Sequence, residues 1–463
     1  MGRELLAGLD VGTTSVKALL VTPEGEEVAL GRTPTTWTST EFGAETSAES
    51  LADAAWQALS SALAQVPGDR VIALGVASMA EAGVLVGPDD TPVAPVVAWH
   101  DHRDEQQLAD LVASLGSERF SAVTGLPIWT QWSLTKHRWL VDNLPAARGA
   151  TRRYNIAEWV TRSLGGDPAT ELSLASRTGW LGLATGRPWS ESMAWSGAAE
   201  NMMSTLVSAG TPLGTARTDG SLAAVHGATL TVAGHDHQAA VVGVGSTGPG
   251  DEFDSCGTAE AILRTIEPGL DPTAIAALTG EGVTVGWHAI RDRWCLLGAT
   301  QGGLILGRVQ AALGVDRQGL DDLDAAALAA TDNPAVLHIT DGAEVTVAPG
   351  ADPGQVWRAA TRAVTEQARS LSHSLDRASG PRRGLVVAGG WTNSAAVMSA
   401  KADAFGELRR ATTTEAGARG AAFLAGLASG TYATHGDMPN GANYQARDHP
   451  RPNSHHDSED PST

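Results

Sequence analysis

Short apolar runs separated by polar or glycine-rich segments form the main pattern along the chain. Runs of about four to eight apolar residues that are bounded by turn residues are typical of buried β-strands. The pattern therefore predicts strands at residues 5–9, 16–21, 71–77, 93–98, 229–233 and 385–388.

Helical periodicity occurs between these runs. Thr46 and Glu49 have the spacing of a capping box, and they precede a stripe of apolar residues with a period of three to four. A second, alanine-rich helix is predicted over 415–429, stopped by Gly430. Strands that alternate with helices indicate α/β layering. The stripe of the first helix comprises Leu51, Ala55, Ala58, Leu59, Ala62 and Leu63.

Length and charge narrow the class of protein. A chain of 463 residues is expected to form two domains. The formal net charge of −20 argues against a nucleic-acid or anionic-membrane partner, both of which need basic patches. Two cysteines, Cys256 and Cys295, imply no disulfide framework. The first strand leaves no room for a signal peptide and no run of ~18 apolar residues occurs, so we expect a cytoplasmic protein.

The segment LLAGLDVGTTSVKALLV, from Leu5 to Val21, places one acid and a small-residue turn between two predicted strands. Glycine lets the backbone N–H groups of such a turn approach a bound anion without a Cβ in the way. Lys17 can reach phosphates as a point charge, and Asp10 can hold Mg²⁺ through water. The alternative is a plain β-hairpin in which the acid and the glycine only form the turn.

A second Asp–Gly–Thr cluster lies downstream, in DEFDSCGTAEAILRT at residues 251–265. Asp254, Gly257 and Thr258 echo the acid, glycine and threonine of the opening turn, with a spacing that differs by one residue. This is a weak internal repeat, with one small-residue turn in each half. Two such halves could bind one polyphosphate between them, from opposite sides of a cleft.

VAGHDHQAAVVGVGS places Asp236 directly after an apolar strand and before a small-residue, helix-like run. An acid at the carboxyl end of a strand lies where α/β folds bind ligands. A carboxylate there can accept a proton from a substrate hydroxyl during phosphoryl transfer. The alternative role, capping of the following helix, is compatible with the first.

GLVVAGGWTNSAAVMSAKADAFG, at residues 384–406, predicts a strand, a Gly-Gly turn and the start of a helix. Gly389 and Gly390 would let a flat group pack against the backbone, and Asn393 offers a side-chain hydrogen bond. Such a turn is also common as a tight connection without a ligand. The chain has no P-loop motif and no well-placed G-x-G-x-x-G, which disfavours both of those nucleotide sites.

Taken together and in this order, the motifs resemble the FGGY carbohydrate kinases of the actin-like ATPase superfamily, over about residues 4–430. DVGTTSVK is similar to the family's first phosphate motif and DSCGTAE to the second. AGHDHQAA carries Asp236 at the position of the catalytic base, and the Gly-Gly segment resembles the adenosine-binding turn. Further matches are GVASMAEAGVLV with Glu81, AWHDHR with Trp99, Asp101 and Arg103, SLTKHRWLVDN, and EAGARGAAFLAG.

The resemblance implies an α/β fold with two RNase H-like (actin-like ATPase) domains and a cleft between them. It implies a sugar- and phosphate-binding domain over 1–235 and a nucleotide-binding domain over 236–432. The polar, proline-containing composition from about Gly436 onward predicts a disordered tail over 433–463. The implied cofactors are ATP and Mg²⁺, with Asp10 as the metal-orienting residue. The expected nucleotide-binding residues are Asp10, Gly12, Thr13, Thr14, Lys17, Gly257, Thr258, Gly389, Gly390 and Asn393.

The implied reaction is phosphorylation of a small sugar or sugar alcohol, with Asp236 as general base and Glu81, Trp99 and His237 around the substrate. A ketopentose such as xylulose is favoured, although the pocket matches no subgroup cleanly. Xylulose kinases of this family usually carry Met-His where this chain has Ala80–Glu81, and glycerol kinases carry Arg-Glu. The segment 338–367 is also shorter than in the family and lacks its Gly-Glu-Arg-Pro stretch.

Two other interpretations remain open from the sequence. One is a non-catalytic sugar or nucleotide sensor on the same fold, because fold does not fix function. The other is an actin-like ATPase without a sugar substrate. Under all three, the expected partner is a small molecule and neither nucleic acid nor membrane, and the oligomeric state is open, a homodimer included.

Overall fold

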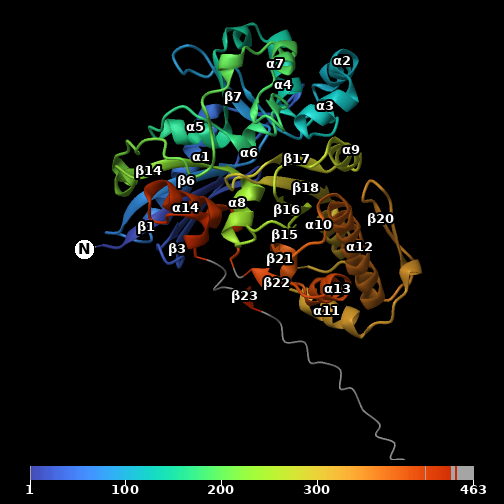
Figure 1. Cartoon of the computed structure of the whole chain (residues 1–463). Helices are drawn as coiled ribbons and strands as arrows, with labels where there is room; N and C mark the ends of the chain where they lie inside the picture. Colours follow the sequence, from blue (N-terminus) through green and yellow to red (C-terminus); the bar gives the residue numbers. More distant parts are fainter. Residues whose placement is uncertain (1, 317, 412, 440–443, 446–463) are drawn as a thin grey trace, which may run out of the picture.

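The computed structural model describes residues 2–316, 318–411, 413–439 and 444–445, and it is built on two large β-sheets with helices packed around them (Figure 1). The first sheet has the strand order β14-β6-β1-β2-β3. Strand β1 pairs antiparallel with β2 and parallel with β6. Its strands are β1 (Glu4–Val11), β2 (Ser15–Val21), β3 (Glu27–Pro34), β6 (Arg70–Ser78) and β14 (Thr229–His235).

The second sheet has the order β17-β18-β16-β15-β21-β22-β23. Its five inner strands, β18 to β22, repeat the pairing of the first sheet. A hairpin, β15–β16, is flanked by an antiparallel strand on one side and by two parallel strands on the other. The strands are β15 (Asp251–Cys256), β16 (Glu260–Ile266), β17 (Thr284–Trp287), β18 (Trp294–Thr300), β21 (Gly384–Ala388), β22 (Arg409–Ala411) and β23 (Tyr444–Gln445). The internal repeat expected from the two Asp–Gly–Thr clusters is thus present in the topology.

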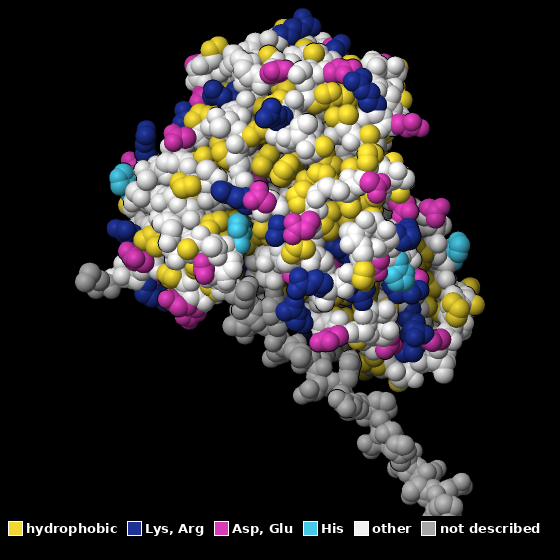
Figure 2. Space-filling model, in the orientation of Figure 1, with side chains coloured by type: hydrophobic (Ala, Val, Ile, Leu, Met, Phe, Trp, Pro, Cys, Tyr) yellow, Lys and Arg dark blue, Asp and Glu magenta, His cyan; other side chains and the backbone are white. Residues whose placement is uncertain are grey.

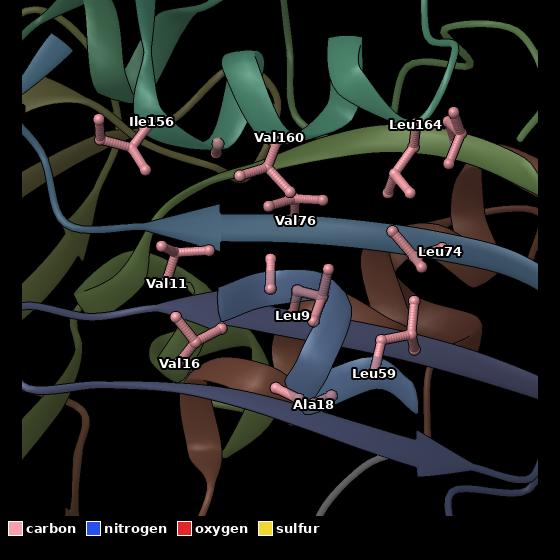
Figure 3. Packing of buried hydrophobic residues seen from close by; sticks show 14 of the residues in the cluster. Leu9, Val11, Val16, Ala18, Leu59, Leu74, Val76, Ile156, Val160 and Leu164 are labelled. Carbon is pink, nitrogen blue, oxygen red and sulfur yellow. The ribbon is translucent and has the colours of Figure 1, made fainter. Parts of the chain in front are cut away.

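The core of the first sheet is apolar because alternate strand residues face two helices, α1 (Ala48–Leu63) and α5 (Ile156–Ser163). Figure 3 shows the stripe Ile156, Val160 and Leu164 above Val76 of β6. Helix α1 forms as predicted, but Ser47, not Thr46, is its N-cap. The Ser47 hydroxyl accepts a hydrogen bond from the Ser50 N–H, so the capping box expected from Thr46 and Glu49 is wrong.

Two helices, α8 (Asp236–Gly243) and α14 (Ala416–Ser429), pack against each other and lie between the sheets (Figure 1). The backbones approach closely because glycines occupy positions where any side chain would collide with a neighbouring backbone carbonyl. A Cβ on Gly420 would lie 1.7 Å from the Ala239 carbonyl oxygen, and one on Gly8 of β1 would lie 1.8 Å from that of Ala418. The small-residue sequence of α14 is therefore a packing requirement, and Gly430 ends the helix in the left-handed conformation as predicted.

Smaller elements complete the structure. The predicted strand at 93–98 is reduced to β8 (Val96–Val97), which extends the pair β4 (Thr38–Thr40) and β5 (Gly43–Thr46). Three two-stranded sheets are formed by β7 (Gly83–Val86) with β9 (Arg152–Asn155), β10 (Thr170–Glu171) with β13 (Leu206–Val207), and β11 (Leu181–Gly182) with β12 (Arg187–Pro188). The shortened 338–367 segment contributes a fourth, β19 (Leu337–Ile339) with β20 (Val345–Val347).

Helices outside the two sheets form two further groups. The first belongs to the lobe above the first sheet: α2 (Glu105–Leu115), α3 (Ser117–Thr124), α4 (Ser133–Asn143), α6 (Leu172–Ala175) and α7 (Ser190–Ser196). The second surrounds the second sheet: α9 (Pro272–Gly280), α10 (Gly302–Ala312), α11 (Leu320–Ala329), α12 (Pro353–Ser379) and α13 (Ala395–Phe405).

The predicted tail begins with ordered contacts. Met438 is buried beside Tyr432 in the cluster around α14, and β23 pairs with β22. Residues 440–443 and 446–463 of the predicted tail lie outside the described residues. Within the described ranges, no helix combines the length and apolarity needed to cross a membrane. On the face shown in Figure 2, Lys and Arg side chains are interspersed with Asp and Glu.

Candidate active site

Two cavities meet between the sheets. The first, of about 320 Å³, opens between the β1–β2 hairpin and the start of α14. The second, of about 400 Å³, lies between the loop after β6 and strands β16 to β18. Asp236 and His237 belong to the wall of both cavities. Residues that line the first include Asp10, Lys17, Ser255, Gly389, Gly390, Thr413, Thr414, Glu415 and Gly417.

The charged floor of the first cavity comes from three elements. Lys17 on β2 lies with its Nζ 3.6 Å from Asp10 on β1 and 3.5 Å from Glu415, just before α14. The Asp10 carboxylate raises the pKa of Lys17, so this cation is fully protonated at neutral pH. Arg32 also forms an ion pair with Glu415. The arrangement places the Lys17 ammonium between two carboxyl groups, at the point where the first predicted phosphate turn begins.

The first turn is held by hydrogen bonds that use much of its own backbone. The Gly12 N–H donates to the Ser15 carbonyl, and the Gly12 carbonyl accepts from the Thr35 hydroxyl. The Thr13 side chain faces the second cavity, where the Trp99 indole N–H donates to its hydroxyl at 2.8 Å. Gly12 and Thr14 lie in the turn but do not line either cavity.

Asp236 is the first residue of α8, directly after β14, and it is not the N-cap, a position that His235 occupies. Its Oδ1 accepts a hydrogen bond from the His237 N–H at 2.6 Å and lies 3.2 Å from His235 Nε2. Burial, followed by the nearby charge of Asp10, raises the pKa of Asp236 well above the ordinary carboxyl range. The side chain is nevertheless 24% exposed, and that exposed part faces the cavities.

The two histidines beside Asp236 are neutral. Burial lowers the pKa of His235 and of His237, with the Arg177 charge as the next cause. Neutral imidazole can both donate and accept hydrogen bonds. The two neutral rings therefore add no charge to this end of the second cavity.

Glu81 also lines the second cavity, and its backbone is strained. It is a non-glycine residue with φ of 67°, in the left-handed region. Its carbonyl accepts hydrogen bonds from Ser133 Oγ at 2.6 Å and Arg153 Nη2 at 2.9 Å, which hold the strained backbone. One side-chain oxygen, Oε1, accepts from Arg177 Nε at 2.7 Å and from Gln131 Nε2 at 3.2 Å. Strain of this kind is concentrated at ligand-binding sites.

Arg177 connects the two sheets across the second cavity. Its Nη1 donates to the Thr284 hydroxyl of β17 at 2.8 Å, while its Nε binds Glu81. The guanidinium also lies over the Trp132 ring, 4.9 Å from the centroid. The cavity is therefore lined by residues of both halves of the chain, with a fixed cation and a fixed carboxylate at one end.

Two tryptophans line the second cavity: Trp99, which was expected there from the sequence, and Trp129, which was not. Trp99 lines the second cavity, and Trp129, 40% exposed, lines it from the other side. Trp132 is fully buried behind Trp129, with the rings stacked 5.8 Å apart. Asp101 and Arg103 do not line either cavity: Asp101 accepts from the Ala44 N–H and pairs with Arg103, which fixes the loop that carries Trp99.

The second predicted turn and the Gly-Gly turn lie against each other. Gly257 and Thr258 connect β15 to β16 and do not themselves line either cavity; their neighbours Ser255 and Ala259 line the first and the second. Gly389 has φ of 108°, and a Cβ there would lie 2.5 Å from the Cys256 carbonyl oxygen.

The predicted adenosine-side residues divide into two groups. Gly389 and Gly390 line the first cavity, and no atom lies within 4 Å of where a Cβ on Gly390 would be. Asn393 does not line it; its side-chain oxygen accepts a hydrogen bond from Arg410 at 2.5 Å.

Several lining residues carried no usable signal in the sequence. Glu415 follows three threonines before α14, a position that the sequence marks only as the start of a helix. Arg177, Gln131 and Thr284 reach the second cavity from segments more than 40 residues apart, and only the fold brings them together.

The donor set of the first cavity fits a hydrated divalent cation. Asp10 Oδ1 is buried and has no hydrogen-bond partner among the described residues. Asp236 and Glu415 add two carboxyl groups to the same wall, against the single Lys17 cation. Carboxylates are the ligands that Mg²⁺ uses beside water and phosphate oxygens.

Comparison with known proteins decides the family. The model of the FGGY family of carbohydrate kinases, N-terminal domain, matches residues 5–243, and that of the C-terminal domain matches residues 322–429. The chain belongs to the FGGY family of carbohydrate kinases. These enzymes are phosphotransferases, and the family confirms both the α/β two-domain architecture and the enzyme class expected from the sequence.

Individual relatives of this FGGY kinase carry two different names. A xylulose kinase of Streptomyces rubiginosus is 30% identical over 68% of this chain and 64% of its own length. A glycerol kinase of Saccharopolyspora erythraea is 27% identical over 94% of this chain and 92% of its own.

Among solved structures, a xylulose kinase from Rhodospirillum rubrum is similar with a TM-score of 0.82 and 23% identity, over 94% of this chain and 92% of that one. Plasmodium falciparum glycerol kinase with ADP also gives 0.82, at 16% identity, over 96% and 94%. At these identities the structures establish the fold alone.

Proposed function

We propose that this FGGY kinase transfers the γ-phosphoryl group of ATP to a hydroxyl of a small ketose or polyol, with Asp236 as general base. One observation carries the proposal: Asp236 lies in the wall shared by the two cavities. A nucleotide in the first cavity and an acceptor in the second would place the γ-phosphate and the attacking hydroxyl on either side of this carboxyl. Positioning and one base are the main contributions of a protein to phosphoryl transfer.

The nucleotide is assigned to the first cavity. Lys17 and the turn at 257–258 would contact its phosphates, and Gly389 and Gly390 would border the adenosine. Asp10 would hold Mg²⁺, which neutralises charge on the phosphate oxygens when it is bound. Gly12, Thr14 and Asn393 have structural contacts of their own, so we assign them to the shaping of the turns.

In the proposed step, Asp236 accepts the proton of the attacking hydroxyl as its oxygen bonds to the γ-phosphorus and the bond to the leaving ADP oxygen breaks. The raised pKa of Asp236 suits this exchange, because a base whose pKa lies nearer to neutrality accepts a proton more readily. The neutral His235 and His237 would hydrogen-bond the carboxyl and the acceptor without competing for the proton.

The acceptor is proposed to be a neutral polyol. Glu81 and Arg177 form an internal ion pair, so the far end of the cavity offers a carboxylate oxygen and guanidinium N–H groups without net charge. Hydroxyl groups can both donate to the former and accept from the latter. Trp99 and Trp129 give the carbon skeleton an apolar wall.

Two acceptors compete within this class. A ketopentose such as xylulose is favoured by the cavity volume of about 400 Å³, which exceeds the need of a three-carbon polyol. Glycerol is favoured by Glu81, which resembles the Arg-Glu pair of glycerol kinases, and by the relatives that cover more than nine tenths of the chain.

A substrate panel tests the proposal. ADP release with Mg²⁺-ATP is measured with ketopentoses, ketohexoses, tetritols, pentitols and glycerol, and the phosphorylated carbon is located by ³¹P–¹H NMR. One acceptor that raises ADP release well above the rate without sugar supports the proposal and names the substrate. ADP release that no acceptor stimulates would favour a sensor or an ATPase without a sugar substrate.

A further inference from the structure

The chain contains three lysines, Lys17, Lys136 and Lys401. Lys401 lines neither cavity and is buried against the second sheet. The Lys401 side chain on α13 is 1% exposed. Its Nζ lies 2.5 Å from Asp254 Oδ2 on β15 and 2.6 Å from Glu260 Oε1 on β16. Removing an ammonium and two carboxylates from water costs free energy. We therefore expect this buried cluster to have a specific role.

The two carboxylates flank the second predicted phosphate turn. Cys256 and Glu260 are the last cross-strand pair before the turn, and Asp254 lies two residues before Cys256 on the same strand. The other oxygen of Glu260 accepts from the Thr300 hydroxyl at 2.7 Å, which ties the turn to the end of β18. Lys401 therefore binds one carboxylate on each strand of the hairpin, next to the turn formed by residues 257–259.

The same lysine also connects the turn to the adenosine side of the first cavity. Helix α13 begins at Ala395, after a short 3-10 helix (Gly390–Asn393) that starts at the Gly-Gly turn, and Lys401 lies on its second turn. On the opposite side, a Cβ on Gly303 of α10 would lie 1.8 Å from the Gly257 carbonyl oxygen. With contacts this tight, a small displacement of the hairpin would redirect the N–H groups of the turn.

A metal site does not explain this cluster. Asp254, Cys256 and Glu260 offer ligand atoms within 4.8 Å of one another, but the Lys401 ammonium already supplies the positive charge. Burial raises the pKa of the Cys256 thiol, which keeps it protonated and a poor ligand. The protein's own cation occupies the place that a metal ion would take.

We propose that Lys401 is a positioning residue for nucleotide binding: its ammonium holds Asp254 and Glu260 together and so fixes the 257–258 turn against the phosphates. This inference rests on the proposed function, in which that turn contacts the nucleotide. Without the ammonium, two buried carboxylates would repel each other across the base of the hairpin.

The test is Mg²⁺-ADP affinity by calorimetry for Lys401→Met, with Arg264→Met as the matched control. Arg264 forms an equally buried ion pair with Glu252 in the same hairpin, at the end remote from the turn. We expect Lys401→Met to weaken ADP binding at least about tenfold, a difference well above calorimetric error. Arg264→Met is expected to lower the unfolding temperature but leave ADP affinity unchanged.

Two further readouts separate positioning from general stability. In turnover, Lys401→Met should raise KM for ATP while KM for the acceptor stays as in the wild type. The charge-balanced variant Asp254→Asn/Glu260→Gln/Lys401→Met should recover most of the lost affinity, because it removes the repulsion. If Lys401→Met does not fold, Asp254→Asn takes its place, with a smaller loss of affinity expected.

Wild-type ADP affinity in folded Lys401→Met, or in Asp254→Asn where that is the variant measured, would overturn the inference. Equal weakening in Arg264→Met would overturn it as well, because the effect would then be one of general stability. These outcomes differ from failure of the proposed function, in which the wild-type protein itself would not bind Mg²⁺-ADP.

Discussion

At the residue scale, the surroundings of individual carboxyl groups shift their pKa values in opposite directions. Asp236 is desolvated and lies near the negative charge of Asp10, so its pKa is raised well above the ordinary value. Other acids, such as Asp101, accept hydrogen bonds from Arg103 and backbone N–H groups, which lower the pKa of that carboxyl. Groups with strongly shifted pKa values inside clefts are candidates for chemistry.

The raised pKa of Asp236 can be measured directly in the ligand-free protein. A ¹³C titration of aspartate carboxyls, with Asp236→Asn to assign the signal, should give a pKa above the ordinary aspartate value of 3.8. Asp10→Asn should move it down, because the second cause of the shift is then gone. A pKa at or below 3.8 in the wild type would contradict the described environment of Asp236.

Glu171 makes a prediction about stability. Burial raises its pKa to about 7 from 4.5, although Ser173 and the Leu174 N–H donate to it. The unfolded chain therefore releases this proton first, and the free energy of unfolding should fall as the pH rises from 4.5 to 7. Glu171→Gln should remove this part of the slope, worth on the order of 1–3 kcal/mol.

Chemical denaturation at several pH values provides the measurement for Glu171. The matched control is Glu191→Gln, which removes an exposed acid paired with Arg119 instead of a buried carboxyl. Parallel pH profiles for the wild type and Glu171→Gln would show that Glu171 is ionised in the folded state.

The chemistry-bearing residues could be predicted in part. Asp10, Lys17, Asp236 and the Gly-Gly turn were marked by their positions at strand ends and turns, and the structure brings them to one cavity. Arg177 could not be found in this way. Its role depends on a contact with Glu81, 96 residues away in the sequence, and apolar or polar periodicity says nothing about such a pairing.

At the element scale, the decisive feature is the close packing of α8 and α14 between the sheets. Carbonyl oxygens of one element lie where side chains of the next would be, so the helices can approach only through glycines. The sequence predicted both helices and the end of the second one, because periodicity and Gly430 are local signals. It could not predict which sheet each helix would cover.

A pair of glycine substitutions tests this packing. Gly420→Ala in α14 would place a Cβ 1.7 Å from the Ala239 carbonyl oxygen, so we expect a loss of about 1–3 kcal/mol or more in unfolding free energy. Gly307→Ala in α10 is the control, since nothing lies within 4 Å of its Cβ. It should stabilise the protein by about 0.5–1 kcal/mol, because alanine favours the helix.

Thermal and denaturant unfolding of the two variants give the comparison. Opposite signs of the two changes are expected. Equal effects of Gly420→Ala and Gly307→Ala would mean that α14 can move away from α8 without cost.

At the scale of the whole molecule, the two sheets share one five-strand topology, and each contributes one hairpin turn to the region where the cavities meet. The sequence repeat pointed to this duplication through only three residues in each half. The edge strands β17 and β23 fall outside it, and their strand partners are set by tertiary contacts. Residues of both halves line the acceptor cavity, so its shape depends on how the halves meet.

The most direct test of the account is acceptor-stimulated ADP release by the wild type and Asp236→Asn, measured beside their Mg²⁺-ADP affinities. A general base contributes about 10²–10⁴-fold to a rate, so we expect a loss of that size in kcat with ADP affinity largely retained. Asp236→Asn that keeps wild-type turnover with the best acceptor would contradict the assignment of the base and, with it, the proposed meeting of nucleotide and sugar at this residue.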